Sequence, residues 1–381
     1  MKIVGLETYV VENPTNRGQK ITIFLKLTTD NGIEGIGEPV RVGFDPEAIV
    51  QMIRSVGEQH VVDSDPFKIE EMWRKTYMIS YRPGAALMGI ISGFEMAYWD
   101  IIGKALEQPI YNLLGGQYNA KIRSYTYLYS TAENVSQAET QKIQTDPYLA
   151  AERAAAYVKM GFTAIKLDPA RPAIIPAPHQ VPLETLENAE AVIRNVREAV
   201  GDRCDILIGT HGQMTTSSAI RLAKRLEKYD PLWFEEPVPP ENKDEMARVA
   251  HHTTIPVATG ERLYTKYEFR EVLEKKAASI LQFALGSVGG ILEAKKIAGM
   301  AEAYYAHIAP HFYAGPVAAT ANIQLDTCCP NTLMQESLER FDGFQAELLK
   351  EPIQWEEGYI IPPTKPGLGI ELNEQALIKY K

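Results

Sequence analysis

The feature that most restricts the fold of this chain is a regular alternation of short strand-like runs with amphipathic helical segments from residue 122 onward. Helical periodicity separates most of the runs, as in Leu183 to Val200 and Ser217 to Tyr229. The eight runs are residues 122–128, 163–167, 205–208, 232–235, 255–258, 279–283, 307–309 and 332–336. Strands that alternate with crossover helices over about 220 residues predict a parallel (β/α) barrel. A doubly wound sheet is the alternative, but no Gly-x-Gly-x-x-Gly motif follows the first strand.

The residues before this region have a different pattern. Alternating apolar positions at 21–27, a turn at Asp30-Asn31-Gly32 and a second run at 33–39 predict a β-hairpin. Helical patterns follow, including a nearly continuous apolar segment from Ala85 to Leu106 that must be buried on most sides. Because Leu113-Leu114-Gly115-Gly116 closes this region, we place a boundary near residue 117.

Charge and composition exclude several classes of function. The 39 Lys and Arg residues against 49 Asp and Glu residues give a net charge of -10, so we expect no nucleic-acid partner. The apolar stretch from Ala85 to Phe94 is too short to cross a bilayer, so we expect no membrane association. The chain begins without a secretory pattern, and three cysteines are too few for a disulfide framework. These features predict a cytoplasmic protein.

In a (β/α) barrel, functional side chains lie at the carboxyl ends of the strands, and here those ends are unusually polar. A single charged residue there is often a solvated loop residue, and a lone histidine is more often structural than catalytic. Six ends carry an ionisable residue, however, and neighbouring ends meet at one mouth, so we predict a site there. The ends read Lys166-Leu167-Asp168, Gly209-Thr210-His211, Glu235-Glu236, Gly260-Glu261-Arg262, Gln282-Phe283-Ala284, Pro310-His311 and Gln335-Glu336.

Glu235 and Glu261 end successive strands, so we expect their carboxylates to face each other. Two like charges at short range require a cation or a shared proton, and hard oxygen ligands suit Mg2+. The alternative is an ion pair with Arg262 or Lys166. With a metal in place, Lys166 and His311 would stand on either side of it as the acid and base that move a proton next to a carboxylate.

A set of short motifs, in this order and spacing, resembles the enolase superfamily, and specifically the mandelate racemase-like acid-sugar dehydratases such as galactonate and mannonate dehydratases. The resemblance runs from end to end. It rests on Gly37-Glu38-Pro39, Tyr98-Trp99-Asp100, Leu114-Gly115-Gly116, Phe234-Glu235-Glu236-Pro237, Gly260-Glu261-Arg262, Gly289-Gly290, Ala309-Pro310-His311 and Pro366-Gly367-Leu368-Gly369.

The resemblance implies an α/β fold in which an α+β capping domain covers a (β/α)7β TIM-like barrel. The cap would comprise residues 1–117 and the tail from about 350 to 381, and the barrel residues 118–349. It also implies a small-molecule sugar-acid substrate, a Mg2+ cofactor with Mn2+ as a possible substitute, and a homo-oligomer. The implied reaction is removal of the α-proton of an aldonate-type acid and loss of its 3-hydroxyl, which gives a 2-keto-3-deoxy acid.

The resemblance assigns roles to individual residues. Glu235 and Glu261 match two metal ligands, and His211 matches the acid that protonates the leaving hydroxyl. His311 matches the base on the seventh strand, and Glu336 matches the glutamate that hydrogen-bonds the substrate carboxylate.

Two positions depart from the family pattern. Gly209 stands where the third metal ligand, an Asp, is normal. Asp168 is the expected replacement, although His211 could turn toward the metal and would then favour Mn2+, Fe2+ or Zn2+. Ala284 stands where an Asp normally pairs with the base, so either His311 acts without that partner or Lys166 takes the base role.

Substrate contacts are expected from Arg262 and from three cap residues, Tyr81, Arg82 and Arg41. Tyr125, Tyr127 and Tyr129 alternate on the first barrel strand, and we interpret this row of phenols as packing with polar tips.

Two other functions remain open. One is an isomerase of the same superfamily (an epimerase, racemase or cycloisomerase), which needs no acid for a leaving group and should tolerate loss of His211. The other is a homologue that has lost metal-dependent catalysis, which Gly209 and Ala284 favour.

Overall fold

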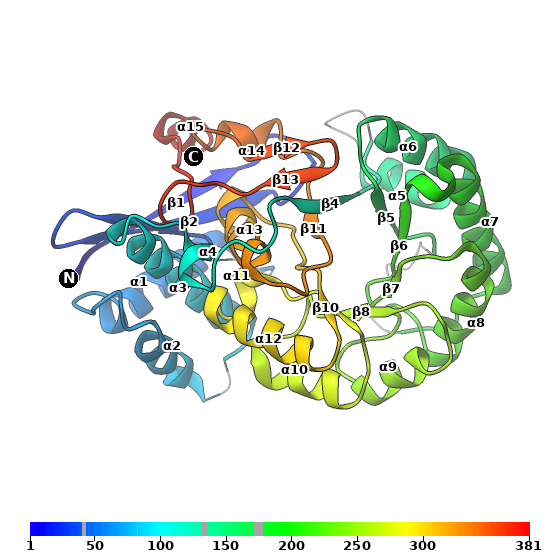
Figure 1. Ribbon diagram of the computed structural model, residues 1–381, viewed down its shortest axis with the longest axis horizontal. Helices are drawn as coiled ribbons and strands as arrows, with labels where there is room; N and C mark the ends of the chain where they lie inside the picture. Colours follow the sequence, from blue (N-terminus) through cyan, green and yellow to red (C-terminus); the bar gives the residue numbers. More distant parts are fainter. Residues whose placement is uncertain (40–42, 82, 131–135, 171–177) are drawn as a thin grey trace.

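The computed structural model describes residues 1–39, 43–81, 83–130, 136–170 and 178–381. The N-terminal part contains an antiparallel sheet in the order β1-β2-β3 with helices beside it (Figure 1). The predicted hairpin is confirmed, because β2 and β3 pair antiparallel across the Asp30-Asn31-Gly32 turn. Its elements are β1 (Ile3–Glu12), β2 (Ile21–Thr29), β3 (Glu34–Gly37), α1 (Pro46–His60), α2 (Ile69–Tyr77), η1 (Met78–Ser80), α3 (Ala85–Ala105) and α4 (Ile110–Leu113).

All eight predicted runs form parallel strands of a closed barrel. The strands pair in chain order, and β11 returns to pair with β4. A parallel bridge between Ile308 and Thr332 joins β10 to the segment that enters β11. The strands are β4 (Ile122–Tyr127), β5 (Ala164–Leu167), β6 (Asp205–Gly209), β7 (Trp233–Glu235), β8 (Val257–Thr259), β9 (Ile280–Leu281), β10 (His307–Ile308) and β11 (Gln335–Ser337).

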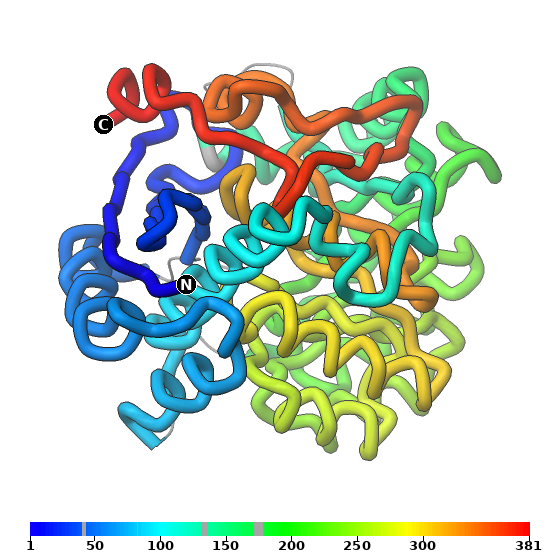
Figure 2. The backbone as a smooth tube through the Cα atoms, turned by 60° about the vertical axis from the view of Figure 1, so that its left-hand side comes forward, coloured from blue at the N-terminus to red at the C-terminus, as the bar shows by residue number. Residues whose placement is uncertain are grey.

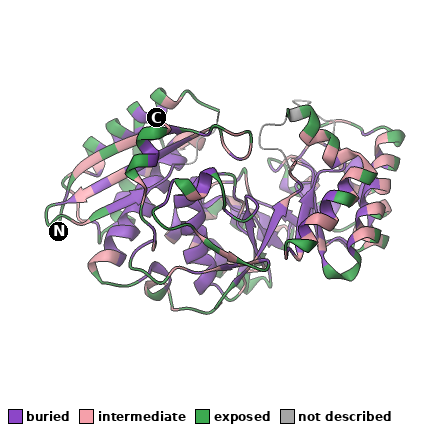
Figure 3. Cartoon of the chain, turned by 90° about the horizontal axis from the view of Figure 1, so that it is seen from above, coloured by how far each residue is buried: buried purple, intermediate pink, exposed green. Residues whose placement is uncertain are grey.

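Helices cover the outside of the barrel, with α6 to α9 following its curve in Figure 1. Figure 3 shows buried residues on the strands and exposed residues on the outer faces of these helices. The helices of this part of the chain are α5 (Gln137–Thr145), α6 (Pro147–Lys159), α7 (Leu183–Val200), η2 (Gly201–Arg203), α8 (Thr216–Leu226), η3 (Glu227–Tyr229), α9 (Lys243–Ala250), α10 (Thr265–Glu274), α11 (Leu285–Val288), α12 (Ile291–Ala303), α13 (Pro316–Cys328) and α14 (Phe344–Glu347), of which α11 and α13 are buried throughout.

The barrel interior is a packed core below the mouth. Each of the eight strands, or the residue beside it, contributes one buried side chain to it. Tyr125 and Trp233 meet edge to face there, with ring centroids 5.0 Å apart. The packing role expected for Tyr125 is therefore confirmed. The layer consists of Tyr125, Ala164, Leu207, Trp233, Ala258, Ile280, Ala309 and Met334.

Helix α3 is the one helix of the described chain that is long and apolar enough to cross a membrane. In the structure, 89% of its most apolar window is buried, which is typical of a core helix. Its buried carboxylate Glu95 accepts hydrogen bonds from the backbone N–H groups of Ile291 (2.6 Å) and Leu292 (2.8 Å) at the start of α12. The helix of the N-terminal part thus caps a helix of the barrel.

Two further buried carboxylates accept hydrogen bonds from the backbone of distant segments. Glu38 accepts the N–H groups of Gly315 and Ala318 at the start of α13, the latter at 3.0 Å. Asp100 accepts the N–H of Leu368 at 2.9 Å. Glu38 thus joins the sheet to a barrel helix, and Asp100 joins α3 to the C-terminal segment.

Glycines in the quoted motifs let these segments approach closely. A Cβ on Gly37 would lie 1.8 Å from the carbonyl oxygen of Gly93 in α3. A Cβ on Gly367, whose φ is +70°, would lie 2.2 Å from Asp100 Oδ1. Gly37 thus lets the sheet pack closely against α3, and Gly367 lets the C-terminal segment do the same.

The C-terminal segment contacts both parts. β13 (Tyr359–Ile361) pairs antiparallel with β4 and with β12 (Gln354–Glu356), and α15 (Glu374–Lys379) lies near β1. The N–H of Glu12 donates to the carbonyl of Tyr380 at 2.7 Å. Figure 2 shows this red segment running from the barrel to the blue strands at the chain start.

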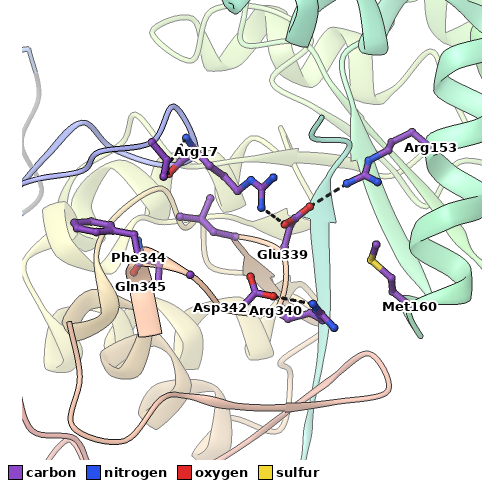
Figure 4. Close-up of a pocket in the computed structure, with 11 residues that line it drawn as sticks. Arg17, Arg153, Met160, Glu339, Arg340, Asp342, Phe344 and Gln345 are labelled. Atoms are coloured by element: carbon purple, nitrogen blue, oxygen red, sulfur yellow. Dashed lines mark hydrogen bonds and ion pairs between the residues drawn. The ribbon is translucent and has the colours of Figure 1, made fainter. Parts of the chain in front are cut away.

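A buried ionic cluster forms another connection. Glu339, which follows β11, accepts from Arg17 of the loop between β1 and β2 and from Arg153 and Tyr157 of α6. Figure 4 shows the two guanidinium groups converging on this carboxylate beside a cleft of about 360 Å³. The cluster fixes the β1–β2 loop against the mouth of the barrel.

Candidate active site at the barrel mouth

A cavity of about 450 Å³ lies at the carboxyl ends of the barrel strands. Six of the predicted site residues line it: Lys166, His211, Glu261, Arg262, His311 and Glu336. Nine other residues complete the wall: Gln19, Tyr127, Tyr129, Thr140, Gln144, Tyr264, Ala284, Ser287 and Tyr313.

Lys166 forms the ionic centre at the base of this cavity. Its side chain is 1% exposed, and its Nζ lies 2.5 Å from Glu235 Oε1 and 3.5 Å from Glu336 Oε1. Burial alone would lower the pKa of Lys166, but the two carboxylates outweigh it and raise the pKa well above its usual value. The ion pair between Lys166 and Glu235, given above as the alternative to a metal site, is present.

The remaining oxygens of the two carboxylates also have donors. Gln282 Nε2 donates to Glu235 Oε2 at 2.8 Å, and the N–H of Phe312 donates to Glu336 Oε2 at 2.8 Å. Both oxygens of Glu235 are therefore engaged by protein groups.

Gly209, at the end of β6, leaves no room for a side chain unless the ends of Tyr127 and Lys166 move. A Cβ at this position would lie 2.7 Å from Tyr127 Oη and 3.2 Å from Lys166 Cε. The tyrosine hydroxyl and the lysine stem occupy the space into which a carboxylate on residue 209 would extend.

His211 pairs with Asp168 across neighbouring strand ends. The distance from His211 Nδ1 to Asp168 Oδ2 is 3.1 Å, and the backbone N–H of Asp168 donates to Gln144 Oε1. Burial lowers the pKa of His211, but the hydrogen bond and charge of Asp168 outweigh it, so the pKa is raised. The structure thus places Asp168 beside His211, where it favours the protonated imidazole.

His311 faces a different carboxylate. Its Nε2 lies 3.5 Å from Glu261 Oε2, while its buried Nδ1 has no hydrogen-bond partner in the part of the chain that the structure describes. Ala284 lines the same cavity and offers no acceptor. Burial would raise the pKa of Glu261, but His311, His211 and Lys166 outweigh it and lower the pKa to about 2.

Arg262 is held in place by a buried carboxylate. Its Nη2 lies 2.7 Å from Glu236 Oε2 and donates to the carbonyl of His211 at 3.3 Å. Tyr81 is 81% exposed and is not part of the cavity wall described above. The predicted contacts Arg41 and Arg82 lie outside the described residues.

Several cavity residues escaped the sequence analysis. Tyr264 and Tyr313 each follow a predicted site residue by two positions, so proximity to a strand end is a signal that would have found them. Tyr129 was interpreted as packing, although it lines the cavity. Gln19 comes from the β1–β2 loop, and no pattern in the sequence around it indicates that it lies at the barrel mouth. Tyr313 Oη donates to the carbonyl of Gly18 at 2.9 Å, which fixes Gln19 over the mouth.

The donors at this mouth do not fit a Mg2+ ion. Among the described residues, no group of three or more His, Cys, Asp or Glu side chains is arranged to hold a metal. Mg2+ requires near-octahedral oxygen ligands, whereas Glu235 is engaged on both oxygens and residue 209 has no side chain.

Comparison with known proteins reveals full-length relatives. The chain matches family models described as the mandelate racemase / muconate lactonizing enzyme N-terminal domain (residues 7–115) and as enolase C-terminal domain-like (residues 149–376). It is 35% identical to a D-galactonate dehydratase from Pectobacterium atrosepticum, and the match covers 100% of this chain and 94% of that protein.

Solved structures agree over the whole chain. A protein from Labrenzia alexandrii DFL-11 is 53% identical with a TM-score of 0.95, and the match covers 100% of this chain and 97% of that one. A mandelate racemase/muconate lactonizing enzyme-like protein from Roseovarius sp. TM1035 is 45% identical with a TM-score of 0.95, covering 100% and 96%.

Proposed function

This chain belongs to the mandelate racemase/muconate lactonizing enzyme family of the enolase superfamily, and from that premise we propose that it is a hydro-lyase that dehydrates an aldonate-type sugar acid to its 2-keto-3-deoxy product. The observation that carries the proposal is that two histidines, His211 and His311, line one cavity and each lies beside a carboxylate. β-Elimination of water from a sugar acid needs one group to remove a proton and another to deliver one.

We assign His311 as the base that removes the α-proton. Lys166 is the other candidate, but its ammonium is fixed between Glu235 and Glu336, and its pKa is raised well above the usual value. A group that holds its proton so firmly is a poor base.

His211 is the matching acid. Asp168 favours its protonated form, so it can deliver a proton to the 3-hydroxyl, which then leaves as water. Lys166 and Arg262 supply positive charge where the enediolate develops, and Glu336 helps to hold the Lys166 ammonium in position. Superfamily members are generally Mg2+-dependent, but no step of this mechanism goes through a metal because the donors present do not fit one.

The cavity suits a polyhydroxylated acid. Its volume falls within the range of about 300–1,000 Å³ that small-molecule sites occupy. Gln19, Tyr129, Tyr264 and Arg262 place amide, phenol and guanidinium groups on its wall, which can hydrogen-bond the hydroxyls of a sugar chain.

The test is a screen of aldonates and aldarates for 2-keto-3-deoxy products with the wild type, His211→Asn and His311→Asn. We expect turnover by the wild type and a roughly 10²- to 10⁴-fold lower kcat in each variant. Incubation in D2O separates the two roles: His211→Asn should still exchange the substrate α-proton, whereas His311→Asn should not. A wild type that consumes none of the library, or that yields only an epimer, contradicts the proposal.

A further inference from the structure

We propose that the ammonium group of Lys166 neutralises the carboxylates of this site, as a divalent cation does in Mg2+-dependent relatives. The chain would then work without a bound divalent metal. The inference concerns the site's charges alone and holds whichever acid is the substrate.

The position of Lys166 is the first support. Its Nζ contacts carboxylates from two different strands, Glu235 on β7 and Glu336 on β11. A buried carboxylate without a counter-charge is strongly destabilising, so Glu235 requires a cation, and Lys166 already provides one. Tyr127 adds its ring face 4.9 Å from the ammonium, which further favours a positive charge there.

Packing at residue 209 is the second support. The Cβ of any side chain at this position would press against Tyr127 Oη at 2.7 Å and Lys166 Cε at 3.2 Å. The absence of a side chain at Gly209 therefore has two effects. It removes a metal ligand, and it makes room for the ends of Lys166 and Tyr127 beside β6. The missing side chain at residue 209 and the Lys166 ammonium are therefore parts of one arrangement.

The third support is that the acidic side chains placed at this mouth by the described part of the chain already have cationic or potentially cationic partners in the protein. A divalent cation would therefore have to displace existing partners, and it would face repulsion from the Lys166 ammonium at short range. The pairs are Glu235 and Glu336 with Lys166, Glu236 with Arg262, Asp168 with His211, and Glu261 with His311.

The experiment measures metal binding directly and needs no substrate. Protein freed of metal by EDTA is titrated with Mg2+ and Mn2+ by calorimetry, and its melting temperature is recorded with and without each ion. We expect no saturable binding and no shift in melting temperature. Binding of one Mn2+ per chain by the wild type, or a fall in its melting temperature on treatment with EDTA, overturns the inference. Absence of dehydratase turnover would not, which separates this inference from the proposed function.

A variant that restores the carboxylate provides the positive arm. In Lys166→Met/Gly209→Asp/Tyr127→Phe, the ammonium and the phenol oxygen are removed and a third acid joins Glu235 and Glu261. We expect this variant to bind Mn2+, seen as loss of the free Mn2+ signal in electron paramagnetic resonance and as a metal-dependent rise in melting temperature. A folded triple variant that binds no Mn2+ contradicts the idea that Lys166 stands in for the metal.

The single variant Lys166→Met covers the case in which the triple variant does not fold. It leaves Glu235 buried without a cation, so we expect either a lower melting temperature that Mn2+ restores or outright Mn2+ binding. Lys266→Met is the matched control, because Lys266 pairs with the buried Glu293 outside the mouth, and Mn2+ should not rescue it. A Lys166→Met protein with unchanged stability and no response to Mn2+ overturns the inference.

Discussion

At the scale of single residues, the pairing of His211 with Asp168 has a consequence for the pH dependence of activity. His211 must carry a proton to act as the acid, so activity is lost as the pH rises through its pKa, which Asp168 raises. In Asp168→Asn that support is gone and the pKa falls. We therefore expect the basic limb of the kcat profile to move to lower pH.

The control for this prediction is Asp205→Asn. Asp205 pairs with Arg123 at 2.7 Å at the opposite end of the barrel, so its loss should leave the profile in place. The measurement is kcat against pH for the three proteins. An Asp168→Asn profile that superimposes on that of the wild type would show that Asp168 does not control the proton on His211.

The residue scale also shows where sequence reasoning reaches its limit. Lys166, His211 and His311 were predicted at the mouth because their strands and strand ends are readable from the sequence. Their partners were not predictable in the same way. Whether Glu235 meets Glu261 or Lys166 depends on the space beside Gly209, which is set by the Tyr127 side chain from another strand.

At the scale of elements, the capping of α12 by a side chain of α3 predicts a large stability effect. Glu95→Ala would leave the buried N–H groups of Ile291 and Leu292 without acceptors. We expect the free energy of unfolding to fall by about 2–4 kcal/mol, measured by urea denaturation. Glu70→Ala, which removes an exposed partner of Lys296, should change it by no more than about 0.5 kcal/mol. Equal effects for the two variants would exclude a capping role.

Long helices were predictable and very short ones were not. The α3 and α7 helices begin where the periodicity predicted, and α7 ends at Val200 as expected, because several turns of amphipathic pattern leave little ambiguity. The four-residue helices α4, α11 and α14 are too short to show a period. Pairing of β13 with β4 joins residues such as Ser124 and Gly358, 234 positions apart, and no local pattern encodes such a contact.

At the scale of the whole molecule, Glu38 makes stability depend on pH. Burial raises its pKa to about 7 in the folded protein, against 4.5 as its ordinary value. The folded state therefore binds this proton more tightly than the unfolded state. Its contribution to stability is fully present below about pH 4.5 and is lost as the pH rises to about 7, by up to about 1.4 kcal/mol per pH unit.

Glu38→Gln tests this prediction, since the amide cannot titrate. As the pH rises from about 4.5 to about 7, we expect the melting temperature of the variant to rise relative to that of the wild type. A difference that stays constant from acid to neutral pH would mean that Glu38 does not take up a proton on folding.

The glycines and buried carboxylates that join distant segments of the molecule bear on how such proteins diverge. Gly37, Glu38, Asp100 and Gly367 belong to motifs that carry the resemblance, yet they contact α3, α13 and the C-terminal segment and do not line the cavity. A descendant can therefore keep its recognisable ancestry while the strand ends acquire new chemistry. Part of the family resemblance therefore rests on packing contacts, and a change of reaction has to be inferred from strand-end positions such as 209 and 284.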